Sequence, residues 1–472
     1  MLWLLILTTV PESSVLHELD TIVAAYADHS EALEEPDKTA NDDEEWWKLF
    51  GDPALTQAIE EGLGENRELR AAATRVQQAR STSLVTLAPY LPQVSADGTA
   101  QAAPFDSLGF QFGGGIAPQP GVDPPDVFYT GSALLNARWE LDIWARGYLD
   151  FQAARLERLA TEGDQASAAH LLSTAIGDTY FDVVVANELI DVVEEQIEAN
   201  QSLLRLLEFR FERGDTTALD VLQQEQQLAA RSAELPPLRV QLRLAQQRLL
   251  VLLGRSPTGP SIDTAPRLAK LPPQPSLGLP KDLLSNRPDL RAALDRMDSA
   301  KRRSGHALER FLPSLSINGS TGWQFFRAEE TSTVFLWGAG ATLSIPLFDG
   351  LNNVAQLQRS RAQELQAEEN LAQAFLQAVQ EVEAARTSEE GNLKQLHLLR
   401  KQEAAAGLAL QESEIRYISG LGDYLAVLTA LNAQHAAQRA ALQAHRDSID
   451  ARIRLHEALA GPWTLGLGAA RD

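Results

Sequence analysis

The chain of 472 residues contains no cysteine. Without a thiol it has no disulfide, no thiolate metal ligand and no cysteine nucleophile. We also expect no lipid-modified N-terminal cysteine in the chain as given. The sequence also lacks any run of about 18 apolar residues, so we expect no transmembrane helix.

Positive charge is scarce as well. The chain carries 41 Lys and Arg against 64 Asp and Glu, a formal net charge of −23 at pH 7. A nucleic-acid partner needs a basic face, so this balance argues against one. Much of the excess is local, because residues 1–52 hold thirteen acidic residues against two lysines. We therefore expect few packed contacts in this acidic lead.

The first ten residues, Met1–Val10, are mostly apolar and resemble the core of a secretion signal. No Lys or Arg precedes them, as a signal would require. Two interpretations stay open, a secretion signal with a mis-assigned start and the start of an ordinary helix.

The spacing of apolar residues changes sharply between Thr130 and Arg213. From residue 130 to 143 every second residue is small or apolar, which predicts a β-strand with one apolar and one mostly polar face. Beyond Gly147 the apolar spacing becomes seven, which is typical of a coiled-coil seam. The seam residues are Ile176, Val183, Ile190, Ile197, Leu204 and Phe211. We therefore predict a helix of roughly 65 residues, about 100 Å long.

The segments before this stretch predict a helix and a second strand. Asp52 and Pro53 are expected to cap and begin a helix that runs to about Leu87. Alternation over residues 92–101 predicts a strand, and the Gly- and Pro-rich residues 102–129 predict an exposed loop.

After the long helix the chain should turn and return. Gly214 suits the end of the first helix. The return helix has its own seven-residue seam, formed by Val221, Leu228, Leu235, Leu242 and Leu249. We expect Pro236 and Pro237 to kink it, and the proline-rich residues 255–280 to form a linker.

The second half repeats the first. Leu91-Pro-Gln-Val-Ser-Ala-Asp-Gly is matched by Leu312-Pro-Ser-Leu-Ser-Ile-Asn-Gly, and Arg210-Phe-x-x-Gly by Arg416-Tyr-x-x-Gly. Alternation predicts two further strands, at about 314–326 and 334–347. The chain should thus hold two copies of the order helix, strand, strand, helix, turn, helix.

Four amphipathic strands of about 10 to 13 residues have the length that tilted strands need to cross a bilayer. Four strands cannot close a barrel, and an open edge in lipid would leave amides without partners. We therefore predict a barrel assembled from several chains, of which three would supply twelve strands. The alternative is a small soluble β-sandwich domain in which one face of the sheet is exposed to water. Aromatic residues suited to the membrane interfaces are Trp139, Trp323, Phe325, Phe335 and Trp337.

Motifs of catalytic and metal sites are missing from the sequence. Gly113-Gly-Gly115 lies in a loop without a following helix, and the eight histidines include no His-Glu-x-x-His. The many carboxylates lie on helix faces, where solvation is their usual role. We expect no catalysis, no metal site and no cofactor.

Six motifs, taken in order, resemble the TolC-type outer membrane efflux proteins, and especially the NodT branch that serves tripartite RND pumps. They are Trp46-Trp47-x-x-Phe50-x-Asp52-Pro53, Trp139-Glu-Leu-Asp142, Arg210-Phe-x-x-Gly-x-x-x-x-Leu-Asp-Val221, Asn286-Arg-Pro-Asp-Leu290, Pro346-Leu-Phe-Asp-Gly350 and Arg416-Tyr-x-x-Gly420. The resemblance covers about residues 45–461.

The resemblance implies an α+β fold with long antiparallel coiled-coil helices and four β-strands per chain. Three copies would form a twelve-stranded β-barrel in the outer membrane and an α-helical tunnel in the periplasm. The two efflux repeats would be residues 46–254 and 281–461, joined by an equatorial linker at 255–280. Residues 1–45 would be an acidic lead and residues 462–472 a C-terminal tail.

The implied function is the exit duct of a tripartite efflux pump for drugs, metals or other small solutes. The implied partners are further copies of the chain, outer-membrane lipid, a periplasmic adaptor (membrane fusion protein) and an inner-membrane RND pump. Two alternatives stay open: the exit duct of a type I protein secretion system, and a non-conducting periplasmic coiled-coil scaffold.

The resemblance also implies roles for the two helical turns, 210–221 and 416–428. The candidates for contact with the adaptor are Arg210, Gly214, Leu219, Arg416 and Gly420. Ordinary helix-turn chemistry is the alternative for these positions.

The family closes its tunnel at the same turns. By motif position Asp220 and Tyr417 match a pair that links neighbouring helices, and Leu425 matches an apolar constriction. The family's acidic ring does not carry over, because its positions hold Ala426 and Thr429.

Overall fold

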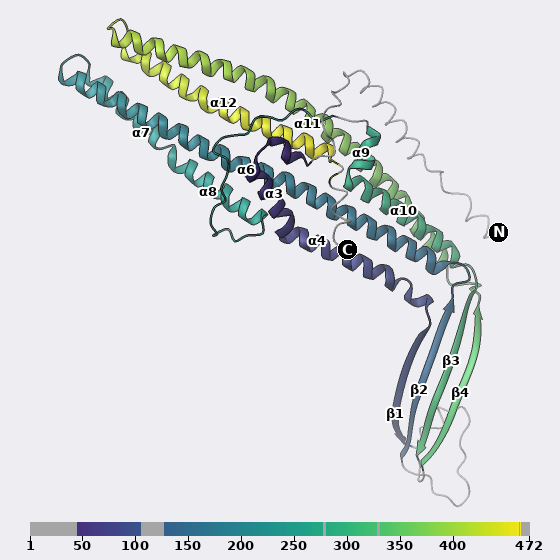
Figure 1. Ribbon diagram of the computed structural model, residues 1–472. Helices are drawn as coiled ribbons and strands as arrows, with labels where there is room; N and C mark the ends of the chain where they lie inside the picture. The colour runs from purple at the N-terminus through teal and green to yellow at the C-terminus, as the bar shows by residue number, and fades with distance from the viewer. Residues whose placement is uncertain (1–44, 105–126, 277–279, 328–330, 462, 464–472) are drawn as a thin grey trace, which may run out of the picture. The chain divides into compact units, whose positions relative to one another are not determined.

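The computed structural model describes residues 45–104, 127–276, 280–327, 331–461 and 463 (Figure 1). These residues form two compact units. The first, here called the strand unit, comprises residues 77–159 and 295–368. The second, the helical unit, comprises residues 45–76, 160–294 and 369–463. The predicted lead, the loop core at 105–126 and most of the tail lie outside the described residues.

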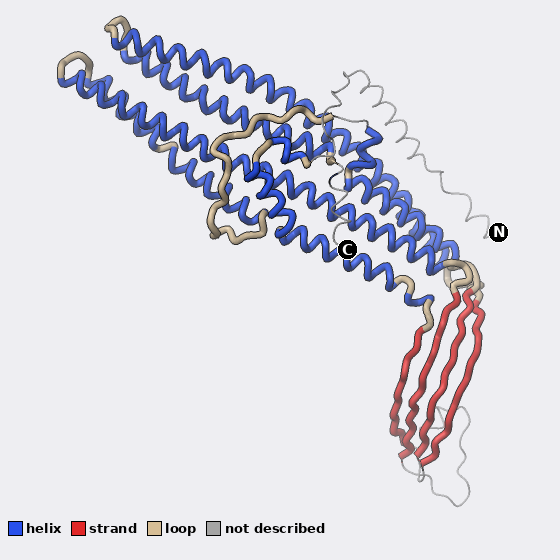
Figure 2. Tube along the Cα trace, viewed as in Figure 1, coloured by secondary structure: helices blue, strands red, loops and turns tan. Residues whose placement is uncertain are grey.

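The elements follow the predicted repeat (Figure 2). The first copy consists of α4 (Arg67–Val85), β1 (Gln93–Pro104), β2 (Val127–Leu141), α6 (Arg146–Glu212), α7 (Ala218–Ser232) and α8 (Leu235–Leu252). The second consists of α10 (Pro288–Glu309), β3 (Ser314–Arg327), β4 (Thr331–Ser344), α11 (Asn352–Ile418) and α12 (Tyr424–Leu459). Shorter elements are η1 (Trp46–Phe50), α3 (Pro53–Glu65), η2 (Ala88–Tyr90) and α9 (Pro280–Asn286). Both α6 and α11 have 67 residues, as the coiled-coil spacing predicted for the first of them.

The predicted helix from Pro53 to about Leu87 is wrong in one respect, because it is two helices. α3 ends and α4 begins at Asn66, whose ψ of 132° is not helical. The Asn66 side-chain oxygen accepts hydrogen bonds from the backbone N–H groups of Glu68 at 2.8 Å and Leu69 at 3.0 Å. Its amide donates to the Leu252 carbonyl at 2.8 Å. Asn66 therefore caps α4 and ties the break to α8.

The return helix is interrupted where the kink is expected, and Ala233 and Glu234 between its two parts keep right-handed helical φ and ψ. α7 ends at Ser232 and α8 begins at Leu235, with Pro236 and Pro237 in the first turn of α8. Proline is tolerated there, since the first N–H groups of a helix have no intrahelical acceptor. The two prolines thus interrupt the hydrogen-bond ladder of the return helix, while the chain keeps helical geometry.

The four strands form one antiparallel sheet in the order β1-β2-β3-β4. The register places Ala96 opposite Leu135, Leu135 opposite Thr321, and Thr321 opposite Trp337. The alternating positions predicted to share a face therefore do so across all four strands.

The predicted strand ends need small corrections. β2 spans 127–141 rather than 130–143, and β4 spans 331–344 rather than 334–347. β4 stops two residues before Pro346, which has no N–H to donate to a ladder. Ala145, just after β2, has a positive φ of 59°, which takes the chain out of extended geometry.

The largest apolar core belongs to the helical unit and explains the Trp46-Trp47 motif. Its buried residues are Trp46, Trp47, Phe50, Leu55, Ala58, Ile59, Ile176, Tyr180, Phe181, Val183, Val184, Leu249, Leu253, Ile449 and Ile453. Beside this core, one carboxylate oxygen of Asp52 caps α3 at the Ala54 N–H, at 2.9 Å. The other accepts the Tyr180 hydroxyl at 2.7 Å, and that hydroxyl in turn accepts the Ala265 N–H at 2.9 Å. The motif thus fastens the start of α3 and the linker to α6.

Among the helices of the described ranges, none combines the length and the apolar character needed to cross a membrane.

Candidate functional site

The turn between α6 and α7 is built from ordinary helix-end chemistry. Gly214 has a φ of 79°, a conformation that suits glycine, and the Asp215 N–H donates to the Arg210 carbonyl at 2.9 Å. The Asp220 carboxylate accepts hydrogen bonds from the Thr216 hydroxyl at 2.8 Å and from the Thr217 N–H at 3.0 Å. Burial pulls the pKa of Asp220 upward, but these hydrogen bonds outweigh it and leave that pKa below its ordinary value.

The turn between α11 and α12 has the same design, as the repeat predicts. Gly420 has a φ of 71°, and the Leu421 N–H donates to the Arg416 carbonyl at 2.8 Å. Asp423 caps α12 by accepting the Ala426 N–H at 2.9 Å. In both turns the positive φ therefore explains why the position holds a glycine, independently of any contact with a partner.

The structure brings two predicted residues of the two turns together, Arg210 and Tyr417. Leu207, Tyr417, Tyr424 and Val427 form a small buried cluster that joins α6, α11 and α12. The Arg210 guanidinium lies over the Tyr417 ring, 4.6 Å from its centre. Arg210 thus connects the end of α6 to the end of α11.

Asp220 and Tyr417, the predicted gate pair, are not bonded to each other. The Asp220 carboxylate accepts from the threonines that start α7, whereas the Tyr417 hydroxyl is buried and has no hydrogen-bond partner in the described part of this chain. A buried hydroxyl without a partner is costly. The linking role of this pair stays a prediction.

Sequence reasoning missed a buried relay beside Tyr417. The Tyr424 hydroxyl donates to Gln224 Oε1 at 2.5 Å. Gln224 Nε2 donates to the carbonyl and the side-chain oxygen of Asn200, at 2.9 and 3.0 Å. A signal existed, since Asn200 and Gln224 occupy the second seam position of their heptads, three residues after Ile197 and Val221. Polar residues at such positions specify how helices pair.

Apolar side chains project from the turns into solvent in this single chain. Leu219 is 61% exposed and Leu425 is 59% exposed, and Leu222 and Leu421 are exposed as well. The Arg416 guanidinium pairs with Glu412 at 2.9 Å on the surface of α11. The turns therefore combine a fixed backbone with an uncovered apolar surface, which is typical of a surface that meets another protein or another copy.

The apolar face of the sheet carries the predicted aromatic residues, all at least partly exposed. Trp323 lies opposite Phe335, with ring centres 5.0 Å apart, and Trp337 lies one pair further along β4. Phe325 completes this group near the end of the sheet where β3 leads into β4. Trp139 lies toward the other end, and its indole N–H donates to the Tyr90 carbonyl at 3.0 Å. The aromatic residues thus lie toward both ends of an otherwise small and aliphatic face.

The opposite face of the sheet is mostly polar, although Leu134, Val334 and Leu336 also lie on it. The Asn136 amide donates to the Asp97 carboxylate at 2.7 Å across β1 and β2. Thr99 and Ser132 share a hydrogen bond of 2.8 Å on the same pair of strands. The sheet thus has one face suited to lipid and one suited to water.

Across the described ranges, no three His, Asp or Glu side chains converge in a way that could hold a metal ion.

Comparison with known proteins agrees with this architecture. The model of the family described as outer membrane efflux protein matches residues 58–255 and 279–461. The pyoverdine export outer membrane protein OpmQ of Pseudomonas aeruginosa is 29% identical over 425 residues, covering 90% of this chain and 88% of that protein. The cation efflux system protein CusC of Escherichia coli O6:H1 is 26% identical over 424 residues, covering 89% and 88%. Among solved structures, the outer-membrane channel OprN has a TM-score of 0.77 and 27% identity, covering 89% of this chain and 92% of that one.

Proposed function

Because the chain belongs to the outer membrane efflux protein family, we propose that three copies of it close into a single duct through which efflux pumps discharge small solutes. The chain is an outer-membrane channel component of the efflux type.

The observation that carries the proposal is the sheet with two open edges. Among the residues that the structure describes, β1 and β4 pair on one side only, with β2 and β3 respectively. In lipid, the unpaired N–H and C=O groups of such edges would each cost several kcal/mol, so the edges must find partners. β1 and β4 run in opposite directions, so β4 of one copy and β1 of the next extend the antiparallel order without interruption.

Three copies would supply twelve strands, which lies within the range of known outer-membrane barrels, whereas one copy lies below it. The apolar face then contacts lipid, and the face that carries Asn136 and Thr99 lines the water-filled passage. The helical unit would continue the duct in the periplasm.

The partners follow from the two turns and from the family. We assign to a periplasmic adaptor the surface formed by the exposed Leu219 and Arg416, the partly exposed Arg210, and the turn backbones at Gly214 and Gly420. The adaptor would connect the duct to an inner-membrane RND pump. The pump would supply the energy, so the duct itself would catalyse nothing.

The gate would lie at the same turns. We assign Tyr417 and Asp220 to the closing contacts and Leu425 to an apolar constriction. The buried, unpartnered Tyr417 hydroxyl supports a contact that is completed by another chain or by another conformation.

The last part of the proposal concerns which solutes pass through the duct. OpmQ is named for pyoverdine export and CusC for cation efflux. A passage lined mainly by uncharged Ser, Thr and Asn suits solutes of such different kinds. We therefore propose that selection occurs in the pump rather than in this sheet.

The absence of cysteine makes the edge pairing directly testable. One cysteine at Thr99 in β1 is combined with one at Gly338, Gly340 or Thr342 in β4, all on the polar face. We expect at least one combination to form disulfides between chains under mild oxidation, giving covalent dimers and trimers and no larger species on denaturing gels.

Two controls sharpen this experiment. Each single cysteine should give no trimer, and Ala100→Cys, which moves the thiol to the apolar face, should fail with the same β4 partners. A chain that stays monomeric in every combination, or one that forms an open ladder of larger species, contradicts the closed trimer.

A further inference from the structure

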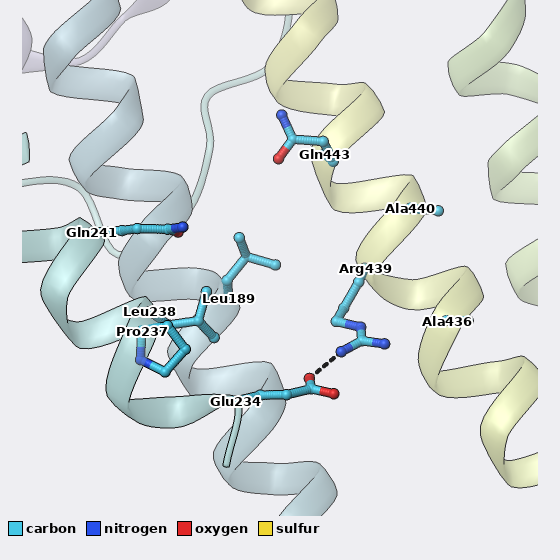
Figure 3. Close-up of a pocket in the computed structure, with 9 residues that line it drawn as sticks. All are labelled: Leu189, Glu234, Pro237, Leu238, Gln241, Ala436, Arg439, Ala440 and Gln443. Atoms are coloured by element: carbon cyan, nitrogen blue, oxygen red, sulfur yellow. Dashed lines mark hydrogen bonds and ion pairs between the residues drawn. The ribbon is translucent and has the colours of Figure 1, made fainter. Parts of the chain in front are cut away.

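A cavity of about 530 Å³ lies in the helical unit between α6, α8 and α12 (Figure 3). Its apolar wall is formed by Leu189, Pro237, Leu238, Ala436 and Ala440. The ion pair of Glu234 and Arg439 lies at one end, and the amides of Gln241 and Gln443 lie further along the same two helices. This is the pattern of a ligand site, with apolar walls and a few polar groups that set orientation.

Two arginines share a single carboxylate at the charged end. Glu234 pairs with Arg439 through one oxygen and with Arg231 through the other, the second at 2.9 Å. The remaining contact of Arg231 is weaker, since its Nη2 donates to the neutral Asn432 side chain at 3.2 Å. The Arg231 side chain is only 10% exposed, and its buried Nε has no hydrogen-bond partner within the described residues.

The balance of charge at this end is therefore positive. The three charged side chains joined by these ion pairs are Arg231, Arg439 and Glu234, which gives two positive charges against one negative charge. His435, buried on α12, does not change this charge balance. Burial and the two arginines lower its pKa to about 4, so it is neutral at pH 7. In a protein with a net charge of −23, this is a local excess of one positive charge.

A buried guanidinium is stabilised when a carboxylate satisfies its charge and its N–H groups. Here one carboxylate serves two guanidinium groups, that of the buried Arg231 and that of Arg439, which is 30% exposed. A second anion at Arg439 would therefore complete the set. The open space for that anion is beside Arg439, whose guanidinium lines the cavity.

We propose that this cavity binds an organic monoanion, a carboxylate joined to an apolar body. The carboxylate accepts hydrogen bonds from Arg439 and competes there with Glu234. The body lies against Leu189, Leu238 and Ala440. The volume lies within the range of about 300–1,000 Å³ that is usual for small-molecule sites. The proposal does not depend on how the chain conducts solutes.

The test uses the full chain in lipid nanodiscs with 4-(trifluoromethyl)benzoate as the probe, followed by ¹⁹F nuclear magnetic resonance. We expect the carboxylate to bind, and the neutral isostere 4-(trifluoromethyl)benzamide to bind at least about tenfold more weakly. Arg439→Gln should weaken binding of the carboxylate about tenfold or more.

Two further variants separate a binding site from a structural ion pair. Ala440→Leu fills the cavity without changing a charge and should abolish binding. Glu234→Gln removes the competing carboxylate and should tighten binding several-fold, which a purely structural ion pair would not do. Arg454→Gln is the matched control, because Arg454 lies on the same helix and pairs with Asp450 at 3.0 Å, away from the cavity.

Several results would overturn the proposal. They are absence of binding by the carboxylate, equal binding of benzoate and benzamide, and undiminished binding in Arg439→Gln or Ala440→Leu. Glu234→Gln binding no tighter than the native chain would overturn the competition with Glu234. Circular dichroism of each variant confirms that the helices are intact before binding is compared.

Discussion

Helices α6 and α12 pass through two contrasting regions of the helical unit. Around Trp46 and Trp47 they pack into a core of fifteen buried residues. Near the two turns the buried apolar cluster has only four members, and polar side chains such as Tyr424 and Gln224 join the helices instead. The same helices are thus held by apolar burial in one region and mainly by hydrogen bonds in the other.

Apolar contacts and hydrogen bonds respond differently when two helices separate. Apolar burial contributes roughly 25 cal/mol per Å² and is lost when the surfaces separate. A hydrogen bond contributes a net of about 1 kcal/mol and can be exchanged for a bond to water or to a partner. If an adaptor opens the channel as proposed, we therefore expect the rearrangement to occur at the turns and not in the core.

The largest expected effect comes from opening the core. Trp47 is 1% exposed, and Trp47→Ala should lower the free energy of unfolding by about 3–5 kcal/mol, because it leaves a large cavity. Urea unfolding followed by circular dichroism measures this. Trp337→Ala removes the same side chain at a site that is 77% exposed in the single chain, and should cost much less. Equal losses in the two variants would contradict the contrast.

The next effect is expected at the relay between the turns. Gln224→Ala should cost about 2 kcal/mol, because the Tyr424 hydroxyl and the Asn200 oxygens lose their partner while still buried. We also expect the variant channel to open more often in planar bilayer recordings. Gln226→Ala, at an exposed position of the same helix, is the control. If both variants behave like the native chain, the relay does not hold the turns together.

A smaller effect concerns an ionisable group close to the core. Burial, helped by the neighbouring Asp450, raises the pKa of Asp178 to about 7, although Arg446 opposes this. The folded state therefore favours the protonated acid, so the contribution of Asp178 to stability should fall as pH rises from about 4 to 7. Asp178→Asn should remove this part of the pH dependence and be the more stable form at pH 8. Asp191→Asn, exposed on the same helix, should leave the dependence unchanged.

The smallest effect separates a helix cap from a gate. Asp220→Ala and Thr217→Ala each remove half of the capping box of α7, and each should cost about 1 kcal/mol. If Asp220 also takes part in closing the channel, only Asp220→Ala should raise the frequency of opening in bilayer recordings. Equal frequencies in the two variants would reduce Asp220 to a cap.

The sequence predicted much of the fold because its signals are local and periodic. Alternation at Leu135 and Trp337 defines a strand face, and the seven-residue spacing through Ile176 and Val183 defines a helix seam. The sequence did not predict the break at Asn66, because no local pattern distinguishes an asparagine that caps a helix from one on a helix surface. Pro236 and Pro237 predicted a kink, and the helix is interrupted just before them.

The candidate site was predicted only in part. Arg210 and Tyr417 were chosen by motif position, and the structure places them in contact. Asp220 was chosen in the same way, but its carboxylate serves the start of α7. Gln224 and Tyr424, which do join the turns, were missed because they are 200 residues apart and no local pattern pairs them.

The sequence by itself determined the type of every major element, since a period of two or of seven arises within a few residues of chain. It also determined that the two halves repeat. Only the tertiary structure decided which polar groups form hydrogen bonds with each other. It also decided that Arg231 and Arg439 both pair with Glu234, and that the Tyr417 hydroxyl has no partner among the described residues. These outcomes depend on how separate hairpins pack, and distances between them are not encoded in any short stretch of sequence.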